Sequence, residues 1–372
     1  MSRNKESLRK PIRIGLLGAG TWALHGHVRV LSLLPDYQLV SVYARRPEVA
    51  QKAAQDYGFK HVATTVEELV SHPEVDMVVV ATTAPQHADG VKAALAAGKA
   101  VYSEWPLTTT TAIAQELVSS ARDSNARTVV GLQRRLAPHN RYLKDLLSQN
   151  FVGELRSVRI HVSIPYLGVS RGPAALWTAP VENFSNVVTI YAGHFLDMLF
   201  AATGWPTEVS AIQMNQFPRV TDQHGNELKA TSLDQLVMLG RIAEKGALSV
   251  HIEGGKSHGS GVQIEITGHD GVLRITNRSA FGNEGDDYVI EGAKAEDGEL
   301  RVMPVPASYD TLPPSNYPSA VLELGELYAA FARDVASGSH TAPDFDDALR
   351  MHQFFDALTL STQTGARISL IR

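Results

Sequence analysis

IGLLGAGTWA, residues 14–23, carries small residues at the spacing G-x-G-x-x-A directly after a short apolar run. Such a turn lets the backbone approach the pyrophosphate of a dinucleotide, and the helix that follows contributes unpaired N–H groups and partial positive charge at its N-terminus. A glycine-rich turn of another α/β fold is the alternative reading. We assign five residues of the stretch to dinucleotide binding: Gly18, Gly20, Thr21, Trp22 and Ala23.

The regular alternation of short apolar runs with helical segments from residue 12 to residue 132 is typical of βαβ units. Expected strands cover residues 12–17, 38–44, 77–82, 100–103 and 127–132. Alanine-rich segments between them have helical spacing and end near glycine, a common C-terminal stop. We therefore predict a doubly wound parallel sheet of the Rossmann type.

The pattern changes after about Arg135. Residues 155–166 alternate apolar and polar side chains with the period of a strand that has one exposed face. Further strands of this kind are expected at 247–254, 262–268 and 271–276, and helices near 193–204, 320–338 and 344–358. The sequence GHDG between the last two strands predicts a hairpin turn.

These patterns define the predicted fold class, α/β plus α+β. A Rossmann domain with a doubly wound parallel sheet is expected over residues 1–134. A mostly antiparallel sheet with helices is expected over residues 135–372, and the family resemblance described below implies that this sheet is open and carries the substrate site and a dimerisation surface. The sequence does not decide whether the C-terminal helices pack back on the first domain.

The overall composition narrows the functional classes. Lys and Arg number 34 against 39 Asp and Glu, a net charge of -5, so no basic field favours direct nucleic-acid binding. The chain has no cysteine, which fits a reducing cytoplasm, and no apolar stretch long enough to predict a membrane span. His25 and His27 form an H-x-H pair without a third ligand at a suitable spacing, so we predict no metal site.

Two arginines follow the second expected strand, where an NAD-preferring enzyme places a carboxylate on the ribose hydroxyls. Arg45 and Arg46 have the charge and geometry to bind a 2'-phosphate instead. NADP(H) is therefore favoured over NAD(H). The alternative is a solvated strand end. Arg134 and Arg135, after the last expected strand, are either contacts of an anionic or polyhydroxyl ligand or half-solvated side chains.

The stretch 78–107 resembles the glucose-fructose oxidoreductase / inositol dehydrogenase family, usually written Gfo/Idh/MocA. The matching residues are Ala81, Thr82, His87, Ala94, Leu95, Gly98, Lys99, Glu104, Pro106 and Leu107. The resemblance implies that Thr82, His87 and Glu104 border the cofactor. It also implies a small polyhydroxyl or carbonyl ligand and a homodimer or larger assembly.

Two positions depart from the family pattern. Trp105 stands where family dehydrogenases carry a proton-transferring lysine, and Ile190 stands where they carry an aspartate. An indole N–H donates hydrogen bonds but is hardly acidic, so a lysine-type alcohol oxidation is excluded. The resemblance leaves His194 as the acid-base candidate, Asp197 as the residue that could orient it, and Trp105 as a wall of the nicotinamide site.

Both departures also resemble one branch of the family, that of the fungal galactose-pathway repressor. Three functions therefore compete. The first is an NAD(P)-dependent oxidoreductase that acts on a sugar, polyol or related carbonyl with a non-lysine acid or base. The second is a catalytically silent dinucleotide sensor with a regulatory protein partner, and the third is an NAD-assisted glycosidase.

Overall fold

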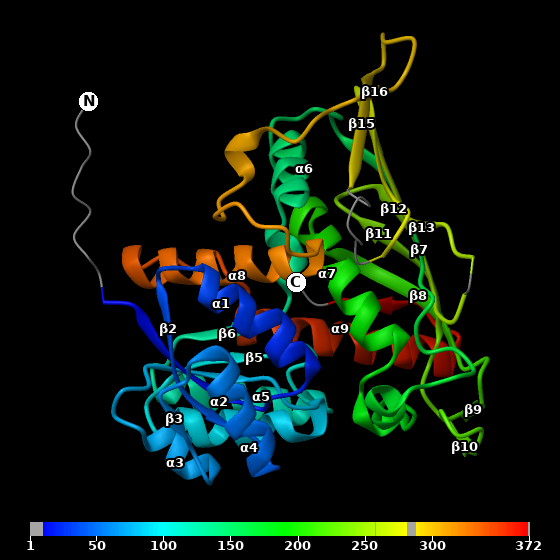
Figure 1. Ribbon diagram of the computed structural model, residues 1–372. Helices are drawn as coiled ribbons and strands as arrows, with labels where there is room; N and C mark the ends of the chain where they lie inside the picture. Colours follow the sequence, from blue (N-terminus) through cyan, green and yellow to red (C-terminus); the bar gives the residue numbers. More distant parts are fainter. Residues whose placement is uncertain (1–9, 257, 281–287, 371–372) are drawn as a thin grey trace, which may run out of the picture.

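The computed structural model describes residues 10–256, 258–280 and 288–370 and contains two large sheets joined through their helices (Figure 1). The first sheet is parallel, with strand order β3-β2-β1-β4-β5-β6. Its strands are β1 Ile12–Leu17, β2 Tyr37–Tyr43, β3 His61–Val62, β4 Met77–Val80, β5 Ala100–Ser103 and β6 Thr128–Val130. This strand order is that of a Rossmann fold, and it confirms the predicted parallel sheet.

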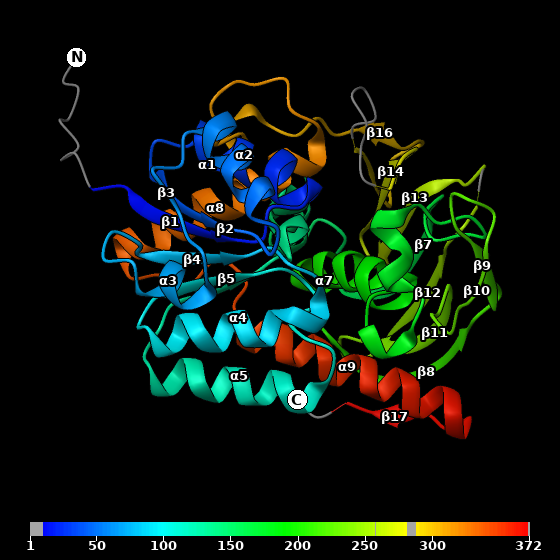
Figure 2. The same ribbon diagram turned by 60° about the horizontal axis from the view of Figure 1, so that its bottom comes forward.

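Helices cover both faces of the parallel sheet, which is why central strand β4 reads as the uninterrupted apolar run MVVV. The helices of this region are α1 Arg29–Leu33, α2 Pro47–Tyr57, α3 Val66–Ser71, α4 Ala84–Ala96 and α5 Thr111–Asp123. Figure 2 shows α4 and α5 together below the sheet, with α1 and α2 above it. Strand β3 and helix α3 were missed in the sequence because each is too short for a clear period.

The second sheet has nine strands in the order β16-β15-β14-β13-β7-β12-β11-β8-β17. They are β7 Leu155–Ser163, β8 Pro206–Met214, β11 Gln235–Ile242, β12 Gly246–Glu253, β13 Gly261–Gly268, β14 Gly271–Asn277, β15 Val289–Lys294, β16 Arg301–Val302 and β17 Ile368–Ser369. Only the β7–β12 pair is parallel, so the mostly antiparallel sheet is confirmed among the described residues. The hairpin predicted from GHDG joins β13 to β14. Strands β9 Arg219–Thr221 and β10 Glu227–Lys229 form a separate hairpin.

Two C-terminal helices connect the sheets. Helix α8, Ser319–Ser337, packs on α1 and contributes to the apolar core of the parallel sheet. Helix α9, Phe345–Thr364, contacts α5 and β6 on one side and β8 on the other. The remaining long helices are α6 Pro138–Ser148 and α7 Ala192–Thr203. None of the described helices is long and apolar enough to cross a membrane.

The chain also contains short π-helices and 3₁₀ turns. Two are π-helices, η1 Ala23–Val28 after the glycine turn and η5 Val187–Tyr191 before α7. The 3₁₀ turns are η2 Gln133–Leu136, η3 Pro173–Thr178, η4 Val181–Asn183 and η6 Ala307–Tyr309. Single π-turns inside helices are frequent at functional sites, and neither was visible in the helical spacing of the sequence.

Candidate functional site

A cavity of about 830 Å³ runs along the carboxyl edge of the parallel sheet and ends against α7. Among the predicted site residues, twelve line it: Gly18, Gly20, Thr21, Trp22, Ala23, Arg45, Arg46, Thr82, His87, Glu104, Trp105 and His194. Asp197 does not belong to the lining. Ligands of open α/β sheets bind at this edge, where the strand order reverses.

The glycine turn has the shape that a pyrophosphate requires. Gly18 has φ +101°, and a Cβ on it would lie 2.8 Å from the carbonyl oxygen of Ala81, so only glycine fits. A Cβ on Gly20 would meet no atom within 4 Å, which leaves its backbone open to the cavity. The N–H of Leu24 donates to the Gly20 carbonyl over 3.0 Å and closes the first helical turn. The turn therefore fits a dinucleotide phosphate at the helix N-terminus.

Arg45 and Arg46 lie at the end of β2, and both side chains are exposed and line the cavity. Neither guanidinium has an ion pair or hydrogen bond with another described residue. Glu48, in the first turn of α2, is not part of the cavity lining. Both groups can bind an anionic ligand without breaking an existing contact.

Glu104 is held by a buried chain of polar groups that the sequence did not reveal. Its Oε1 lies 2.5 Å from Nε2 of His27, and Nδ1 of His27 lies 2.7 Å from the hydroxyl of Tyr328 on α8. Burial raises the pKa of the Glu104 carboxyl, but the contact with His27, together with nearby His87 and His194, outweighs burial and the pKa is lowered. His27 therefore fixes Glu104 rather than a metal ion. Among the described residues no group of three His, Asp or Glu side chains is placed to hold a metal.

His87 connects two parts of the cavity wall. Its Nδ1 lies 2.8 Å from the Pro106 carbonyl oxygen and its Nε2 lies 3.1 Å from that of Thr82. Burial lowers the pKa of His87, so the ring is neutral and donates to one carbonyl at a time. With both nitrogens facing the backbone, His87 positions the wall. The hydroxyl of Thr82 is buried without a partner among the described residues and can bind a ligand.

Trp105 fills the volume beside the candidate nicotinamide site and is only 4 % exposed. Its indole N–H donates to the carbonyl of Thr189 in η5 over 2.9 Å, and its ring lies against His352 of α9. A Cβ on Gly193 would lie 2.2 Å from the indole nitrogen. The indole is thus locked between β5, η5 and α7, and glycine at position 193 is what gives it room.

His194 follows Gly193 on α7 and lies on the cavity wall. The ring is 7 % exposed, and burial, assisted by the nearby positive charge of Arg134, lowers its pKa to about 3. The imidazole is therefore neutral at any working pH. Its Nδ1 is buried without a hydrogen-bond partner among the described residues. Ile190, which replaces the family aspartate, also lines the cavity and offers the ring no partner.

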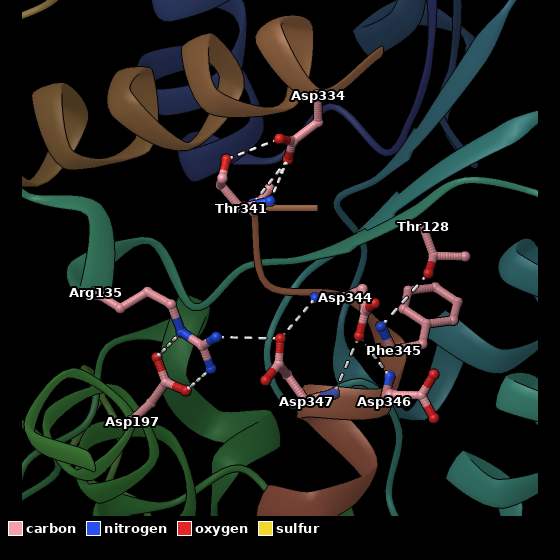
Figure 3. Close-up of polar contacts among 10 residues, drawn as sticks. Thr128, Arg135, Asp197, Asp334, Thr341, Asp344, Phe345, Asp346 and Asp347 are labelled. Atoms are coloured by element: carbon pink, nitrogen blue, oxygen red, sulfur yellow. Dashed lines mark hydrogen bonds and ion pairs between the residues drawn. The ribbon is translucent and has the colours of Figure 1, made fainter. Parts of the chain in front are cut away.

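Asp197 does not orient His194, so this prediction was wrong. Its carboxylate is 2 % exposed and accepts two hydrogen bonds from the guanidinium of Arg135, one of them over 2.9 Å (Figure 3). The same guanidinium also pairs with Asp347 of α9 at 3.1 Å. Asp197 lies one helical turn after His194, but its carboxylate is bound to Arg135 and does not line the cavity. Asp197 therefore joins α7 to η2 and α9.

The two expectations for the arginines after β6 were also wrong. Arg134 is 1 % exposed and bound by the hydroxyl of Tyr288 at 2.8 Å and the carboxylate of Glu323 at 3.5 Å. Arg135 is ion-paired with Asp197 and Asp347, as described above. Neither is half solvated, and neither lines the cavity. The chain buries them because each finds a carboxylate on a distant helix.

Several lining residues were missed in the sequence. They are Gln133, Tyr166, Ala174, Trp177, Tyr191, Ala320 and Glu323. Three of them lie in the loop 164–185, where no period or motif marks a side chain as functional. Ala320 and Glu323 belong to α8 and reach the cavity only because this helix packs against α1. The sequence signal for a role of the loop 164–185 in the cavity wall was its aromatic residues, among them Tyr166 and Trp177.

Comparisons with known proteins agree with this geometry. Residues 12–132 match the family model described as "Oxidoreductase family, NAD-binding Rossmann fold", GFO_IDH_MocA. Residues 138–277 match the model of the Gal80p C-terminal domain. The chain therefore belongs to the Gfo/Idh/MocA oxidoreductase family. Within that family it resembles the Gal80 repressor, as the sequence motifs predicted.

Individual relatives include both enzymes and a regulator. Dehydrogenase aclE from Aspergillus oryzae is 32 % identical over 63 % of this chain and 68 % of its own. The galactose/lactose metabolism regulatory protein GAL80 from Saccharomyces cerevisiae is 24 % identical over 97 % of this chain and 94 % of its own. The structure of levoglucosan dehydrogenase in complex with NADH and L-sorbose has the same fold, with a TM-score of 0.86, 19 % identity and coverage of 98 % and 100 %.

Proposed function

We propose that this protein is an NADP(H)-dependent oxidoreductase that acts on the carbonyl group of a small molecule, with neutral His194 in place of the missing lysine. The observation that supports this most is the position of His194. It lies on the wall of the same cavity as the glycine turn, and neither of its ring nitrogens is hydrogen-bonded to another described residue.

A neutral histidine can assist carbonyl reduction as a hydrogen-bond donor. Its N–H would polarise the carbonyl and stabilise the negative charge that develops on oxygen, a role in which a lowered pKa is an advantage. A bound reduced dinucleotide would supply the hydride. The carbonyl carbon gains that hydride with its electron pair, and the oxygen takes a proton from water, which gives the alcohol. Trp105 and Ile190 exclude further water from the wall around His194.

The NADP(H) preference is supported by the end of β2. Arg45 and Arg46 are unoccupied by other described residues and line the cavity at the position where the ribose of a dinucleotide lies in this fold. A 2'-phosphate there would gain two guanidinium contacts.

The test follows the near-ultraviolet absorbance of NADPH while a panel of aldehydes, ketones and sugars is added. We expect steady oxidation with at least one compound. His194→Ala should lower kcat by about 100- to 1,000-fold, the usual effect of losing one oxyanion donor. His194→Gln, which keeps an N–H donor, should retain much more activity. His25→Gln, which changes an exposed histidine outside the lining, is the matched control.

The pH profile separates this role from ordinary acid-base catalysis. Because the pKa of His194 is about 3, the rate should show no inflection from this residue between about pH 5 and 9. An inflection near neutrality that disappears in His194→Gln would contradict the proposed role.

A second candidate, a dinucleotide-responsive regulatory protein, is favoured by the environment of Trp105. The indole fills the lysine position and is held by Thr189, Gly193 and His352 behind the cavity wall, so the wall has no mobile base at this position. This function predicts saturable NADP binding, no turnover on any compound of the panel, and a change in partner binding or self-association on addition of dinucleotide. Steady NADPH oxidation would refute it.

A homodimer or larger assembly is proposed through the open face of the nine-stranded sheet. Ile212, Val237 and Leu239 lie on neighbouring strands β8 and β11 and are exposed there. Light scattering of the purified protein, compared with a Leu239→Lys variant, tests this assembly. A monomer at micromolar concentration would contradict it.

A further inference from the structure

The part of the cavity beyond Glu104 has a wall of its own, which we call the aromatic subsite. It consists of Trp105, Tyr166, Ala174, Trp177, Ile190, Tyr191 and His194. The inference drawn from it rests on the proposed function, because it specifies what binds beside the dinucleotide.

Four aromatic rings line this subsite. The rings of Tyr166 and Tyr191 stack on one another, at 12° between planes and 5.9 Å between centroids. The indole of Trp177 is held by a hydrogen bond from its Nε1 to the carbonyl of Ala174 over 2.9 Å. Trp105 is fixed from behind by the Thr189 carbonyl. Four aromatic side chains from three separate segments thus converge on one space.

The loop that carries Trp177 is anchored rather than loosely attached. Arg171 is 3 % exposed and donates to the hydroxyls of Thr178 at 3.1 Å and Ser232 at 3.0 Å. Asn183 donates to the Trp177 carbonyl over 2.5 Å. A preformed wall of this kind lowers the ordering cost of binding.

Among the described residues that line the subsite, no charged side chain is left without a partner. Glu104, at its inner edge, is paired with His27, and Glu323 is paired with Arg134. Arg45 lies at the end of β2, three strand positions from β5, which corresponds to about 14 Å at the usual spacing of strands. An anionic ligand would find no cation in the subsite, and a cationic ligand would find no unshared carboxylate.

Polar groups able to satisfy many hydroxyls are also few. Ile190 and Trp105 occupy the positions of the family aspartate and lysine, and each buried hydroxyl without a partner would weaken binding. The hydrogen-bonding side chains that remain in the subsite are His194 and the hydroxyls of Tyr166 and Tyr191, and the neighbouring Gln133 Oε1 is a buried acceptor without a partner among the described residues.

We propose that the aromatic subsite binds an uncharged planar ring that carries one oxygen substituent directed at His194. An aromatic or conjugated cyclic compound fits this description, whereas a polyhydroxyl ring or a carboxylate does not. Ring stacking on the tyrosine and tryptophan faces supplies the affinity, and the hydrogen bond to His194 supplies the orientation.

The proposal is tested by equilibrium dialysis of the full chain loaded with NADP⁺, with naphthol, naphthoate and inositol as probes. Naphthol is planar and uncharged, naphthoate adds a negative charge to the same ring system, and inositol is a ring that carries only hydroxyls. We expect naphthol to bind at least about tenfold more tightly than either of the others. Equal or tighter binding of inositol or naphthoate would overturn the proposal.

Three variants assign the effect to the subsite. Trp177→Ala should weaken naphthol binding by about tenfold, and Trp177→Phe, which keeps a ring, should restore it to within about threefold. Ile190→Asp should weaken naphthol and strengthen inositol binding. His25→Gln, at an exposed position outside the cavity lining, is the control. Unchanged naphthol affinity in both Trp177→Ala and Ile190→Asp would overturn the assignment to this wall.

The binding assay keeps this inference separate from the proposed function. Selective naphthol binding without NADPH oxidation on any carbonyl would refute the enzyme and leave the subsite assignment intact. Turnover on sugars together with a preference for inositol would refute the subsite assignment and leave the enzyme intact.

Discussion

Replacement of Gly193 by alanine puts a methyl group where the indole of Trp105 now lies. The three atoms nearest to the new Cβ all belong to Trp105, at 2.2, 2.7 and 3.1 Å. Contacts below 3.0 Å are not tolerated, and the indole cannot swing away freely because it packs against His352 and is hydrogen-bonded to Thr189. The variant must therefore displace either Trp105 or helix α7.

The cost of this displacement can be estimated term by term. Overpacking of a well-filled core costs about 1–3 kcal/mol. Loss of the hydrogen bond from Trp105 to Thr189 adds about 1 kcal/mol. Alanine in place of glycine inside a helix increases the free energy of unfolding by about 1 kcal/mol. We therefore expect the free energy of unfolding to fall by about 1–3 kcal/mol in Gly193→Ala.

The reasoning predicts a change of sign when the indole is absent. Trp105→Ala alone should cost about 3–5 kcal/mol, but in that background Gly193→Ala meets no indole and should stabilise the protein by up to about 1 kcal/mol. Thermal unfolding of the four proteins, followed by circular dichroism, completes the double-mutant cycle. Additive effects, with the same cost of Gly193→Ala in both backgrounds, would refute the claim that these two residues are fitted to one another.

Three further predictions concern charge. Burial lowers the pKa of His194 and of His352 to about 3. Between about pH 6.5 and 3 the unfolded chain therefore binds protons that the folded chain does not, so the free energy of unfolding decreases as the pH is lowered. At about pH 5 the loss relative to neutral pH is about 2 kcal/mol per histidine. His352→Leu should remove its share, and an equal acid sensitivity of the variant's melting temperature would contradict this. Arg46→Glu should weaken NADP⁺ binding by about tenfold or more while NAD⁺ binding changes little, as measured by calorimetry; equal losses for both dinucleotides would exclude a 2'-phosphate contact. Asp197→Asn breaks a buried ion pair and should lower the free energy of unfolding, measured in urea, by about 3–5 kcal/mol. Asp347→Asn, at the more exposed end of the same network, should lower it by less than about 1 kcal/mol. Equal costs would show that Asp197 is not the anchoring partner.

Local features of the sequence predicted the local parts of the structure. The glycine turn and strands β1, β2, β4, β5 and β6 depend on spacing within a few residues, and they were found where the pattern placed them, whereas β3 was missed. Short-range motifs also brought Thr82, Glu104, Trp105 and His194 together, because each follows a strand or begins a helix at the same edge of the sheet.

The parts that escaped prediction depend on contacts between distant segments. The partner of Asp197 is Arg135, 62 residues earlier, and the partner of His27 is Glu104, 77 residues later. No period in the sequence carries such pairings, since they are set by how the helices pack on the two sheets. For the same reason the loop with Trp177 could not be assigned to the cavity wall.

The packing of α8 has a consequence for the order in which the chain can mature during synthesis. The apolar core that surrounds β1 and α1 contains Leu324, Leu327 and Phe331, and Tyr328 holds His27 behind the dinucleotide site. During synthesis, α8 is added to the chain roughly three hundred residues after the glycine turn. The N-terminal half that is synthesised before α8 therefore lacks part of this core and the hydroxyl that holds His27, and we expect the dinucleotide site to become fully ordered only after α8 has been added.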